Sequence, residues 1–296
     1  MRRNVTAVMN AKGGVGKSTL VLALAETLTA LFGKTVLVID SDSQASVSAM
    51  LMTPQRLHDL QSKALTIVDL IAGHVLDDHS PQDWRSVVAT RVSDIDDAGG
   101  MALIPSDMQL TLLEREVSKD GQYGKLRKAV RAILDGVRQS YDYVLIDCPP
   151  GLSVLTESWL RDADWHLSPT KPDYVSICGL EVFRRFKEHD PQMGFAENLG
   201  VVVNLMDGAS RQDRDYDAWL RSQPANRCFA QPILRSHTLQ QAAVFSPAGR
   251  SHLAKYPGHV GQMVRALTHE FIQRIEAGQR QEPAPGASRI PNLRAV

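Results

Sequence analysis

The sequence has few cysteines and no long hydrophobic run, and both shortages limit the classes of protein to consider. Its 296 residues include three cysteines, which are widely spaced and form no C-x-x-C pair. Such sparse cysteines argue against a disulfide framework or a zinc site and favour a reduced intracellular protein. No stretch of about 18 apolar residues could span a membrane, and residues 1–10 lack the apolar core of a signal peptide. We therefore expect a cytoplasmic protein.

The chain also lacks an excess of charge of either sign, because 33 Lys and Arg balance 33 Asp and Glu. The overall charge therefore excludes no class of partner, whereas its distribution along the chain is informative. Seven aspartates lie between residues 69 and 97, and we interpret this region as a solvated excursion. Residues 218–269 contain no Asp or Glu and form a basic segment. The tail at 279–296 is rich in Pro, Gly and Ser, which predicts disorder.

Short apolar runs alternate with helical stretches through the rest of the chain. The runs show little polar alternation, which predicts strands buried on both faces of a sheet. They lie at residues 5–10, 35–40, 101–106, 141–150, 164–170 and 200–207. Helices are predicted between them, for example at 18–32, 123–139 and 176–188. The alternation predicts a single α/β domain over residues 1–278, with a doubly wound, mostly parallel twisted sheet and helices on both faces.

The segment between the first predicted strand and helix reads MNAKGGVGKST and is close to a phosphate-binding P-loop. Gly16-Lys17-Ser18 matches the end of the pattern G-x-x-x-x-G-K-[ST], but Ala11 stands where the first glycine belongs. Backbone amides of such a loop bind phosphate together with the start of the next helix. Lys17 would contact the β- and γ-phosphates, and the Ser18 hydroxyl would ligate Mg²⁺. We therefore predict a P-loop NTPase that binds a nucleotide and Mg²⁺ through Gly13, Gly14, Val15, Gly16, Lys17, Ser18 and Thr19.

Two further predicted strands end in carboxylates. YVLID ends at Asp147, and TVLVID ends at Asp40, two residues before Asp42. A carboxylate at the end of a buried strand can hold the Mg²⁺ shell of a nucleotide, and a second carboxylate can orient an attacking water. Asp-rich turns are common, so the pair at 40 and 42 is weak support when taken alone.

Taken together, KGGVGKST, DSDSQAS and DCPP resemble the motifs of the ParA/MinD-type deviant Walker A ATPases, with the greatest likeness to ParA-like partition ATPases. The likeness extends over residues 4–277. It implies that the nucleotide is ATP and that Lys12 also binds it, by reaching the phosphates of a partner subunit in an ATP-dependent sandwich homodimer. It implies as well that Lys12, Lys17 and Asp42 are catalytic. It also implies that Asp40 and Asp147 support Mg²⁺ together with Ser18, and that Asn204 contacts adenine.

Two positions depart from the pattern of this family. Ser43 replaces the usual proline of the D-x-D-P-Q segment, where proline sets the loop shape rather than the chemistry. Ile233-Leu234-Arg235 stands where the family often has I-P-R, so the adenine contacts of that segment stay open.

Members of this family bind DNA, membranes or iron–sulfur clusters, and the C-terminal third distinguishes these activities. Basic residues scattered among small and apolar ones favour contact with the DNA backbone without base readout. The candidate DNA contacts are Arg221, Arg227, Arg235, Arg250 and Lys255. The alternative is an ordinary basic surface, or pairing of these residues with the aspartates at 69–97.

The other two activities find less support. A membrane-binding member should end in an amphipathic basic helix, whereas the last predicted helix has an apolar stripe typical of a core. A redox member needs suitably placed cysteines, which are absent. The resemblance therefore implies a cytoplasmic, nucleoid-associated ATPase that binds nonspecific double-stranded DNA and segregates it, with hydrolysis stimulated by a ParB-like adaptor and with no membrane partner. Two alternatives stay open: positioning of another cargo on the nucleoid and, less favoured, a MinD-like membrane ATPase.

Overall fold

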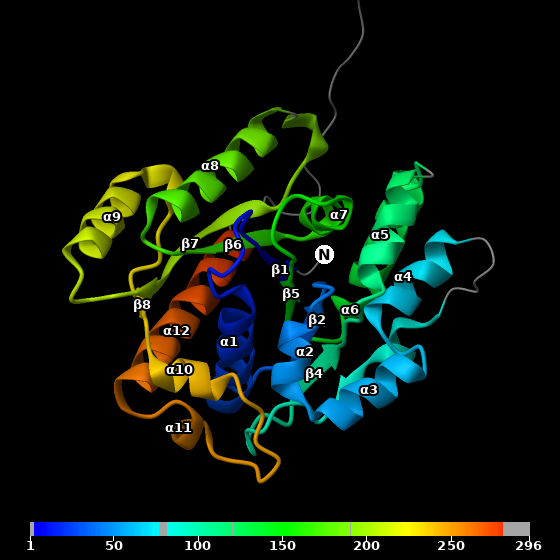
Figure 1. Ribbon diagram of the computed structural model, residues 1–296, viewed down its shortest axis with the longest axis horizontal. Coiled ribbons are helices and arrows are strands. Elements are labelled where there is room, and N and C mark those ends of the chain that lie inside the picture. The colour runs from blue at the N-terminus through cyan, green and yellow to red at the C-terminus, as the bar shows by residue number, and fades with distance from the viewer. Residues whose placement is uncertain (1–2, 77–81, 120, 190, 281–296) are drawn as a thin grey trace, which may run out of the picture.

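The computed structural model describes residues 3–76, 82–119, 121–189 and 191–280, which form an α/β fold around one sheet (Figure 1). The strands are β1 (Val5–Val8), β2 (Val36–Asp40), β3 (Ala89–Thr90), β4 (Met101–Ile104), β5 (Tyr143–Asp147), β6 (Trp165–Thr170), β7 (Glu197–Met206) and β8 (Ile233–Leu234). Their order is β3-β4-β2-β5-β1-β6-β7-β8. Every neighbouring pair is parallel except β3 with β4. The predicted α/β class with a mostly parallel sheet is therefore confirmed.

Helices cover both faces of the sheet. They are α1 (Lys17–Phe32), α2 (Ser46–Leu51), α3 (Pro54–Ser62), α4 (Ile67–Val75), α5 (Leu110–Lys119), α6 (Tyr123–Val137), α7 (Val154–Asp162), α8 (Tyr174–His189), α9 (Arg211–Ser222), α10 (His237–Ala242), α11 (His252–Lys255) and α12 (Gly258–Arg280). Apolar residues of α1, α2 and α12 share one core cluster, and those of α4, α6 and α7 share the other. These two large clusters, one on each face, explain why the strands carry apolar residues on both sides.

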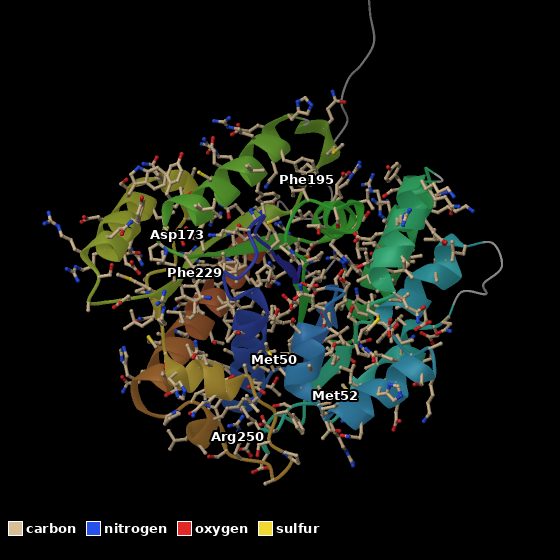
Figure 2. All side chains as sticks on the ribbon, viewed as in Figure 1. Met50, Met52, Asp173, Phe195, Phe229 and Arg250 are labelled. Carbon is tan, nitrogen blue, oxygen red and sulfur yellow. The ribbon has the colours of Figure 1, made fainter. Side chains whose placement is uncertain are left out.

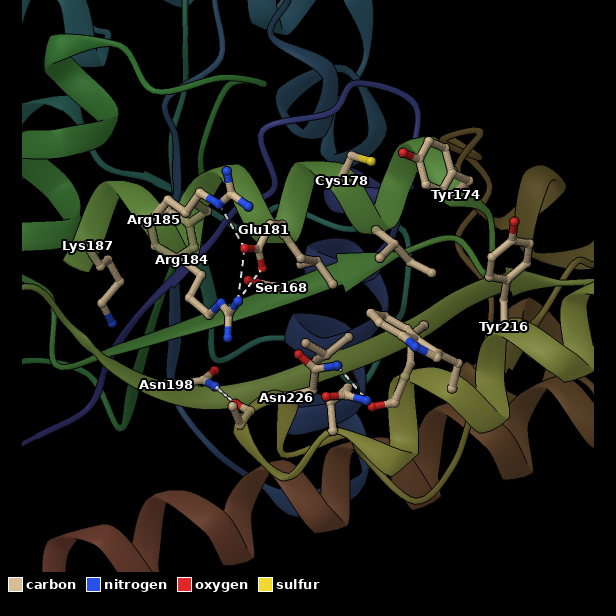
Figure 3. Close-up of a pocket in the computed structure, with 18 of the residues that line it drawn as sticks. Ser168, Tyr174, Cys178, Glu181, Arg184, Arg185, Lys187, Asn198, Tyr216 and Asn226 are labelled. Carbon is tan, nitrogen blue, oxygen red and sulfur yellow. Dashed lines mark hydrogen bonds and ion pairs between the residues drawn. The ribbon is translucent and has the colours of Figure 1, made fainter. Parts of the chain in front are cut away.

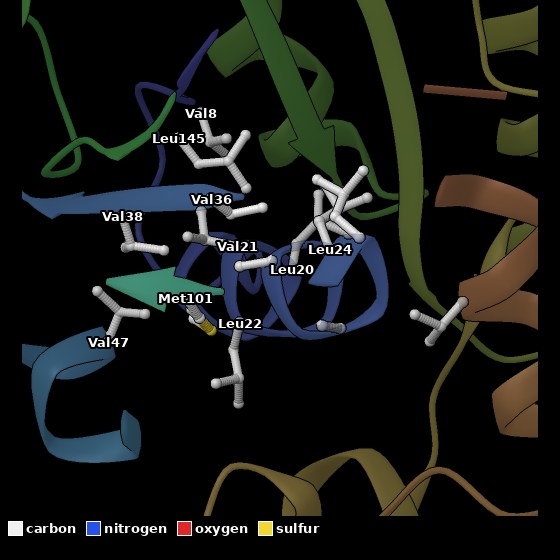
Figure 4. Close-up of a cluster of buried hydrophobic side chains, with 14 of the residues drawn as sticks. Val8, Leu20, Val21, Leu22, Leu24, Val36, Val38, Val47, Met101 and Leu145 are labelled. Atoms are coloured by element: carbon white, nitrogen blue, oxygen red, sulfur yellow. The ribbon is translucent and has the colours of Figure 1, made fainter. Parts of the chain in front are cut away.

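The central strand shows how each residue of a run is assigned to a face. Val8 of β1 belongs to the core under α1, where it joins Leu20 and Leu24 (Figure 4). Val5 and Ala7 of the same strand belong to the core on the opposite face, because successive side chains of a strand point to opposite sides. β1 is thus fixed between two helical layers, and the loop that follows it starts from a rigid base.

The strand register brings the predicted carboxylates together. β5 lies between β1 and β2, with Asp147 opposite Val8 on one side and Asp40 on the other. Both aspartates therefore lie at the carboxyl edge of the sheet, directly beside the loop after β1. This is the edge at which open α/β sheets place their ligands.

One expectation about the less regular regions needs correction, and a second lies almost wholly outside the described residues. The Asp-rich region was expected to be solvated, but α4 contributes Leu70 and Ile71 to the core, and Asp94 is buried. Residues 77–81 of this region lie outside the described part of the chain. The predicted disordered tail also lies outside it, apart from its first two residues, which continue α12 as far as Arg280. Among the described residues, no helix is long and apolar enough to cross a membrane.

Candidate nucleotide-binding site

The loop between β1 and α1 has a backbone shape that suits phosphate. Gly14 and Gly16 have φ angles of 73° and 84°, in the left-handed region that side chains disfavour. A Cβ atom at Gly16 would lie only 2.5 Å from the Nδ2 atom of Asn204. Because Gly16 has no side chain to cap α1, the first amides of that helix face the loop uncapped, where the helix dipole adds positive charge. An anion at this position would bind these amides.

Lys17 is the first residue of α1 and is buried at the base of the loop. Burial lowers the pKa of Lys17 below its ordinary value, and the charges of Asp147 and Asp42 offset this shift in part. A phosphate in the loop would add the negative charge that a buried ammonium group requires. The location of Lys17 therefore fits the phosphate contact predicted for it.

Asp147 is fully buried at the end of β5, and neither of its carboxylate oxygens has a hydrogen-bond partner among the described residues. Burial raises the pKa of Asp147 well above its usual value, repulsion by Asp40 adds to the shift, and the nearby Ser18 hydroxyl opposes it. A buried carboxylate without partners costs free energy unless a cation or donor approaches it. The oxygen atoms of Ser18 and Asp147 therefore fit Mg²⁺, which prefers oxygen ligands.

Asp40, the neighbour of Asp147, differs from it because the protein already satisfies its carboxylate. Its Oδ2 atom accepts hydrogen bonds from the backbone N and the Oγ of Ser48, at 2.9 and 2.6 Å. Burial nevertheless raises the pKa of Asp40 to about 6. Within the described residues no group of three or more His, Cys, Asp or Glu side chains could hold a metal ion. The site thus suits an Mg²⁺ ion that is held partly by a nucleotide. Asp147 would face this ion, and Asp40 would shape the surroundings of the ion.

Asp42 lies in a tight turn after β2 and is mostly buried. Its Oδ1 accepts the Gln44 N–H at 3.0 Å, and its backbone carbonyl accepts the Ala45 N–H at 2.8 Å. Trp159 of α7 anchors the same turn, because its Nε1–H donates to the Ser41 Oγ at 2.6 Å. No local pattern could reveal this support, since the two partners are 118 positions apart.

Lys12 is placed differently from Lys17, at the outer edge of the loop, with 34% of its side chain exposed. Its Nζ lies 3.7 Å from the Oδ1 of Asp173, just before α8. Its backbone N–H donates to the Oδ1 of Asn10 at 2.9 Å. Sequence reasoning identified neither Asn10 nor Asp173, although Asn10 lies directly before the loop motif.

Asn204 closes the other side of the loop. Its Nδ2 donates to the Val15 carbonyl at 2.8 Å, and its neighbour on β8 is Ile233. A cavity of about 60 Å³ lies beside the start of α1 and is lined in part by Thr19, Asn204 and Ile233. Without the family's usual proline, Ile233 and Leu234 still form a strand beside β7. The cavity is therefore the candidate position for a nucleotide base.

Comparisons with known proteins agree with this geometry. Residues 3–192, more than half of the chain, match a family model described as an AAA domain. Chromosome partitioning protein ParA of Caulobacter vibrioides is 29% identical over 279 residues, which are 91% of this chain and 94% of that protein. The chain belongs to the ParA-like P-loop ATPases. Sporulation initiation inhibitor protein Soj of Bacillus subtilis is 31% identical over 182 residues, 60% of this chain and 61% of Soj.

Solved structures support the fold of this ParA-like ATPase. Apo McdA of Cyanothece superposes with a TM-score of 0.71 at 20% identity, covering 92% of this chain and 99% of McdA. Cobyrinic acid a,c-diamide synthase of Mycobacterium smegmatis, with bound ADP and magnesium, gives a TM-score of 0.71 at 22% identity, covering 93% and 96% of the two chains. At these identities the likeness extends to the fold alone.

The basic segment of the ParA-like ATPase requires one correction. Lys255, predicted to contact DNA, is completely buried, with its Nζ 2.6 Å from Glu26 and 2.6 Å from Asp94. Arg250, which lies low in the view of Figure 2, pairs with Asp94 at 2.7 Å. Pairing with the Asp-rich region, the alternative left open above, therefore holds for Lys255 and Arg250. Lys255 cannot contact DNA in this fold.

The other predicted DNA contacts differ in exposure. Arg221 pairs with Asp217 on α9 at 2.9 Å and is only partly exposed. Arg227 and Arg235 are exposed, and so is Arg265 of α12. These three arginines are exposed basic residues of the acid-free segment that a ligand could reach from solvent.

A second hollow, of about 1120 Å³, lies between α8 and α9 and above β6 and β7 (Figure 3). Its walls carry Tyr174 and Cys178 from α8 and Tyr216 from α9. Arg184 and Arg185 on its rim pair with Glu181 of their own helix. The hollow is separate from the loop, although α8 begins beside Lys12.

Proposed function

We propose that this ParA-like ATPase is a switch that dimerises with ATP, binds nonspecific double-stranded DNA as the dimer, and segregates or positions that DNA. The observation that carries the proposal is the different placement of two lysines of one loop. Lys17 is buried within the loop, whereas Lys12 is partly exposed at its edge. Lys17 suits a phosphate of its own subunit, and Lys12 suits a phosphate presented by a second copy. Hydrolysis would then depend on dimerisation.

Each residue of the site has a role in this proposal. Lys17 and the first amides of α1 hold the phosphates, and the partner's Lys12 would stabilise charge that develops on the transferred group. Asp42 would orient the attacking water from its turn after β2. Mg²⁺, held by Ser18 and Asp147, would neutralise charge on the phosphate oxygens. The bound ADP and magnesium of the cobyrinic acid a,c-diamide synthase and the ATP of the McdA complex support these cofactors.

The DNA face in this proposal consists of the exposed basic residues Arg227, Arg235 and Arg265. Hydrolysis would return the dimer to a form with low DNA affinity, and a ParB-like adaptor would stimulate that step. The protein would then be cytoplasmic and associated with the nucleoid. The partition functions named for ParA of Caulobacter vibrioides and for a plasmid partition protein of Borrelia burgdorferi support this direction.

Two alternatives differ in the cargo or surface. Positioning of a non-DNA cargo on the nucleoid would use the same site and the same DNA face. A MinD-like membrane ATPase would need an apolar helix face available to lipid. The apolar stripe of α12, which includes Val264, Phe271 and Ile275, is buried against α1 and the sheet and is therefore unavailable.

A DNA-retention assay tests the proposal. Wild-type protein should stay on nonspecific DNA with ATP and dissociate with ADP, and Asp42→Ala should stay bound with ATP because hydrolysis stops. Arg265→Glu should weaken retention, whereas Lys128→Glu, an exposed residue of α6 on the opposite face, should not. Equal retention on DNA with ATP and with ADP, or binding only to anionic vesicles, would refute the proposal.

A further inference from the structure

The hollow between α8 and α9 exposes aromatic side chains that the proposed function does not use. Tyr174 of α8 and Trp219 of α9 line this hollow and are 67% and 48% exposed. Ile177, Leu180 and Leu220, which also line it, belong to a small apolar cluster. Aromatic and apolar surface that is rimmed by charged residues is typical of a docking site.

Two carboxylates near the hollow are only loosely paired. The Oε1 of Glu188 lies 4.0 Å from the Nε of Arg184, and the Oδ2 of Asp215 lies 3.8 Å from the Nε of Arg211. The Glu188 and Asp215 side chains are 65% and 73% exposed. Exposed pairs of this kind contribute little to stability, so either carboxylate can exchange its partner for another cation.

The basic residues of the same rim are held more firmly. Arg184 and Arg185 each donate a hydrogen bond to Glu181 at 2.9 Å. The Nζ of Lys187 donates to the Ala196 carbonyl, also at 2.9 Å. The rim therefore suits a basic segment better than an acidic one.

α12 ends close to one end of this hollow. In its last turns, Gly278 packs against the Trp165 ring so tightly that a Cβ atom would overlap the ring. Trp165 precedes His166 on β6, and His166 contacts Phe183 of α8 on the opposite face of the sheet. The strand register pairs His166 with Asn198, and both residues line the hollow. A chain that leaves α12 therefore has only to turn around the start of β6 to enter the hollow.

Residues 281–296 follow α12, lie outside the described part of the chain, and are long enough to follow the hollow from end to end. Lys187 and Asn198 lie at one end of the hollow, and Tyr174 and Tyr216 lie at the other (Figure 3). α8 forms one wall with 16 residues, a length of about 24 Å. The 16 residues of the segment span about 50 Å when extended, at roughly 3.1 Å per residue.

The composition of the segment, QEPAPGASRIPNLRAV, matches the hollow. Its three prolines favour an extended conformation that loses little entropy on binding, which is why proline-rich segments dock in grooves lined by aromatic residues. Ile290 and Leu293 supply apolar side chains. Arg289 and Arg294 outnumber the acidic residue Glu282, and guanidinium groups both pair with carboxylates and stack on aromatic rings.

We propose that residues 281–296 dock in the hollow between α8 and α9 of their own chain. Ile290 and Leu293 pack at the aromatic end of the hollow, and the two arginines of the segment pair with the loosely held carboxylates. Because the segment is tethered, its effective concentration is on the order of millimolar, and weak contacts suffice. A protein that uses this face of α8 and α9 must first displace the segment.

Disulfide trapping in the full chain tests the docking, because Cys178 lines the aromatic end of the hollow. In Ala295→Cys, oxidation with diamide at low protein concentration should join the new thiol to Cys178 of the same chain, as seen by peptide mass mapping. Adding Trp219→Ser should slow the trapping about three- to tenfold, as expected from the loss of one aromatic contact. Circular dichroism checks that each variant is folded.

Leu112→Cys, at an exposed apolar position on α5, is the matched control and should not join Cys178. Trapping of Ala295→Cys that is no faster than in this control would overturn the inference. Disulfides that form only between two chains would also overturn it, because the occupant would then be a second copy.

A second measurement tests whether the segment fills the hollow in most molecules. A fluorescent peptide of residues 281–296 is titrated into the full chain without nucleotide. It should bind the double variant Ile290→Asp, Leu293→Asp about tenfold more tightly than wild type, because the altered segment leaves the hollow open. Leu112→Asp should bind the peptide as wild type does. Equal binding to wild type and the double variant, or binding to neither, would overturn the inference. Both measurements omit ATP and DNA, so failure of the proposed function would not change their outcome.

Discussion

Lys255→Met should destabilise the fold rather than specifically weaken DNA binding. Lys255, Glu26 and Asp94 have no exposed side-chain surface, and the ammonium group lies 2.6 Å from each carboxylate. The substitution leaves two buried carboxylates with only the partly exposed Arg250 as a charge partner. Breaking a buried ion pair by removing one member costs about 3–5 kcal/mol, because the remaining charge is uncompensated. We expect a loss of that size in the free energy of unfolding at neutral pH.

The pH dependence of this loss provides an internal check. Burial raises the pKa of Glu26, and Lys255 acts to lower it. Without Lys255 the pKa of Glu26 in the folded state rises further above its unfolded value. Stability from the protonated carboxyl is then present at low pH and lost as the pH rises through the folded pKa. The difference between variant and wild type should therefore be smaller at pH 5 than at pH 8.

Urea unfolding at both pH values, followed by circular dichroism, measures these differences. Arg265→Met, on the exposed side of α12, is the matched control and should change the free energy of unfolding by less than about 1 kcal/mol. Adding Glu26→Gln to Lys255→Met should recover part of the loss, because one uncompensated charge is removed. A Lys255→Met protein as stable as the control, but defective in DNA retention, would refute the assignment of Lys255 to the core.

Three further predictions concern the nucleotide site. Gly16→Ala should cost about 1–3 kcal/mol of stability and weaken nucleotide binding in calorimetry, because φ is 84° and the new Cβ would meet Asn204; wild-type affinity would contradict this. Burial raises the pKa of Asp40 from 3.8 to about 6. The stability that its protonated carboxyl contributes is therefore present below pH 4 and lost as the pH rises to 6. In urea unfolding, the free energy of unfolding of Asp40→Asn should therefore rise by roughly 3 kcal/mol relative to that of wild type over this pH range. Asp147→Asn should raise the Tm of the nucleotide-free protein, since a buried unpaired carboxylate is removed, yet weaken Mg²⁺-dependent nucleotide binding about tenfold; a lower Tm would contradict the reasoning.

The parts of the fold that follow from local sequence were predictable. The runs at 35–40 and 141–150 contain β2 and β5, because an unbroken apolar run flanked by turn residues has few alternatives to a buried strand. The family resemblance then assigned Asp40 and Asp147 to one Mg²⁺ site, and the register places these two residues side by side at the carboxyl edge of the sheet. Strand boundaries were less accurate, since β7 begins at Glu197, before the apolar run that signalled it.

The errors arose where composition was used in place of local or long-range structure. The Asp-rich region concealed a capping box, in which the Thr66 hydroxyl and backbone N–H both donate to Asp69 at the start of the buried helix α4. The pattern T-x-x-D was present in the sequence and could have signalled that helix. By contrast, Lys255 and Asp94 are 161 positions apart, and no local pattern predicts that they pair. The contact between Lys12 and Asp173 was hidden for the same reason.

The packing of α12 on α1 has a consequence for how the chain acquires its structure during synthesis. α1 leaves the ribosome before α12, yet Leu24 and Leu28 belong to the core cluster that residues of α12 complete. Glu26 of α1 likewise pairs with Lys255, which is synthesised 229 positions later. Until α11 and α12 are synthesised, the nascent chain therefore carries an apolar helix whose buried carboxylate has no lysine partner, and exposed apolar surface of this kind favours aggregation. The helix that follows the phosphate loop is therefore fully packed only after α12 has docked.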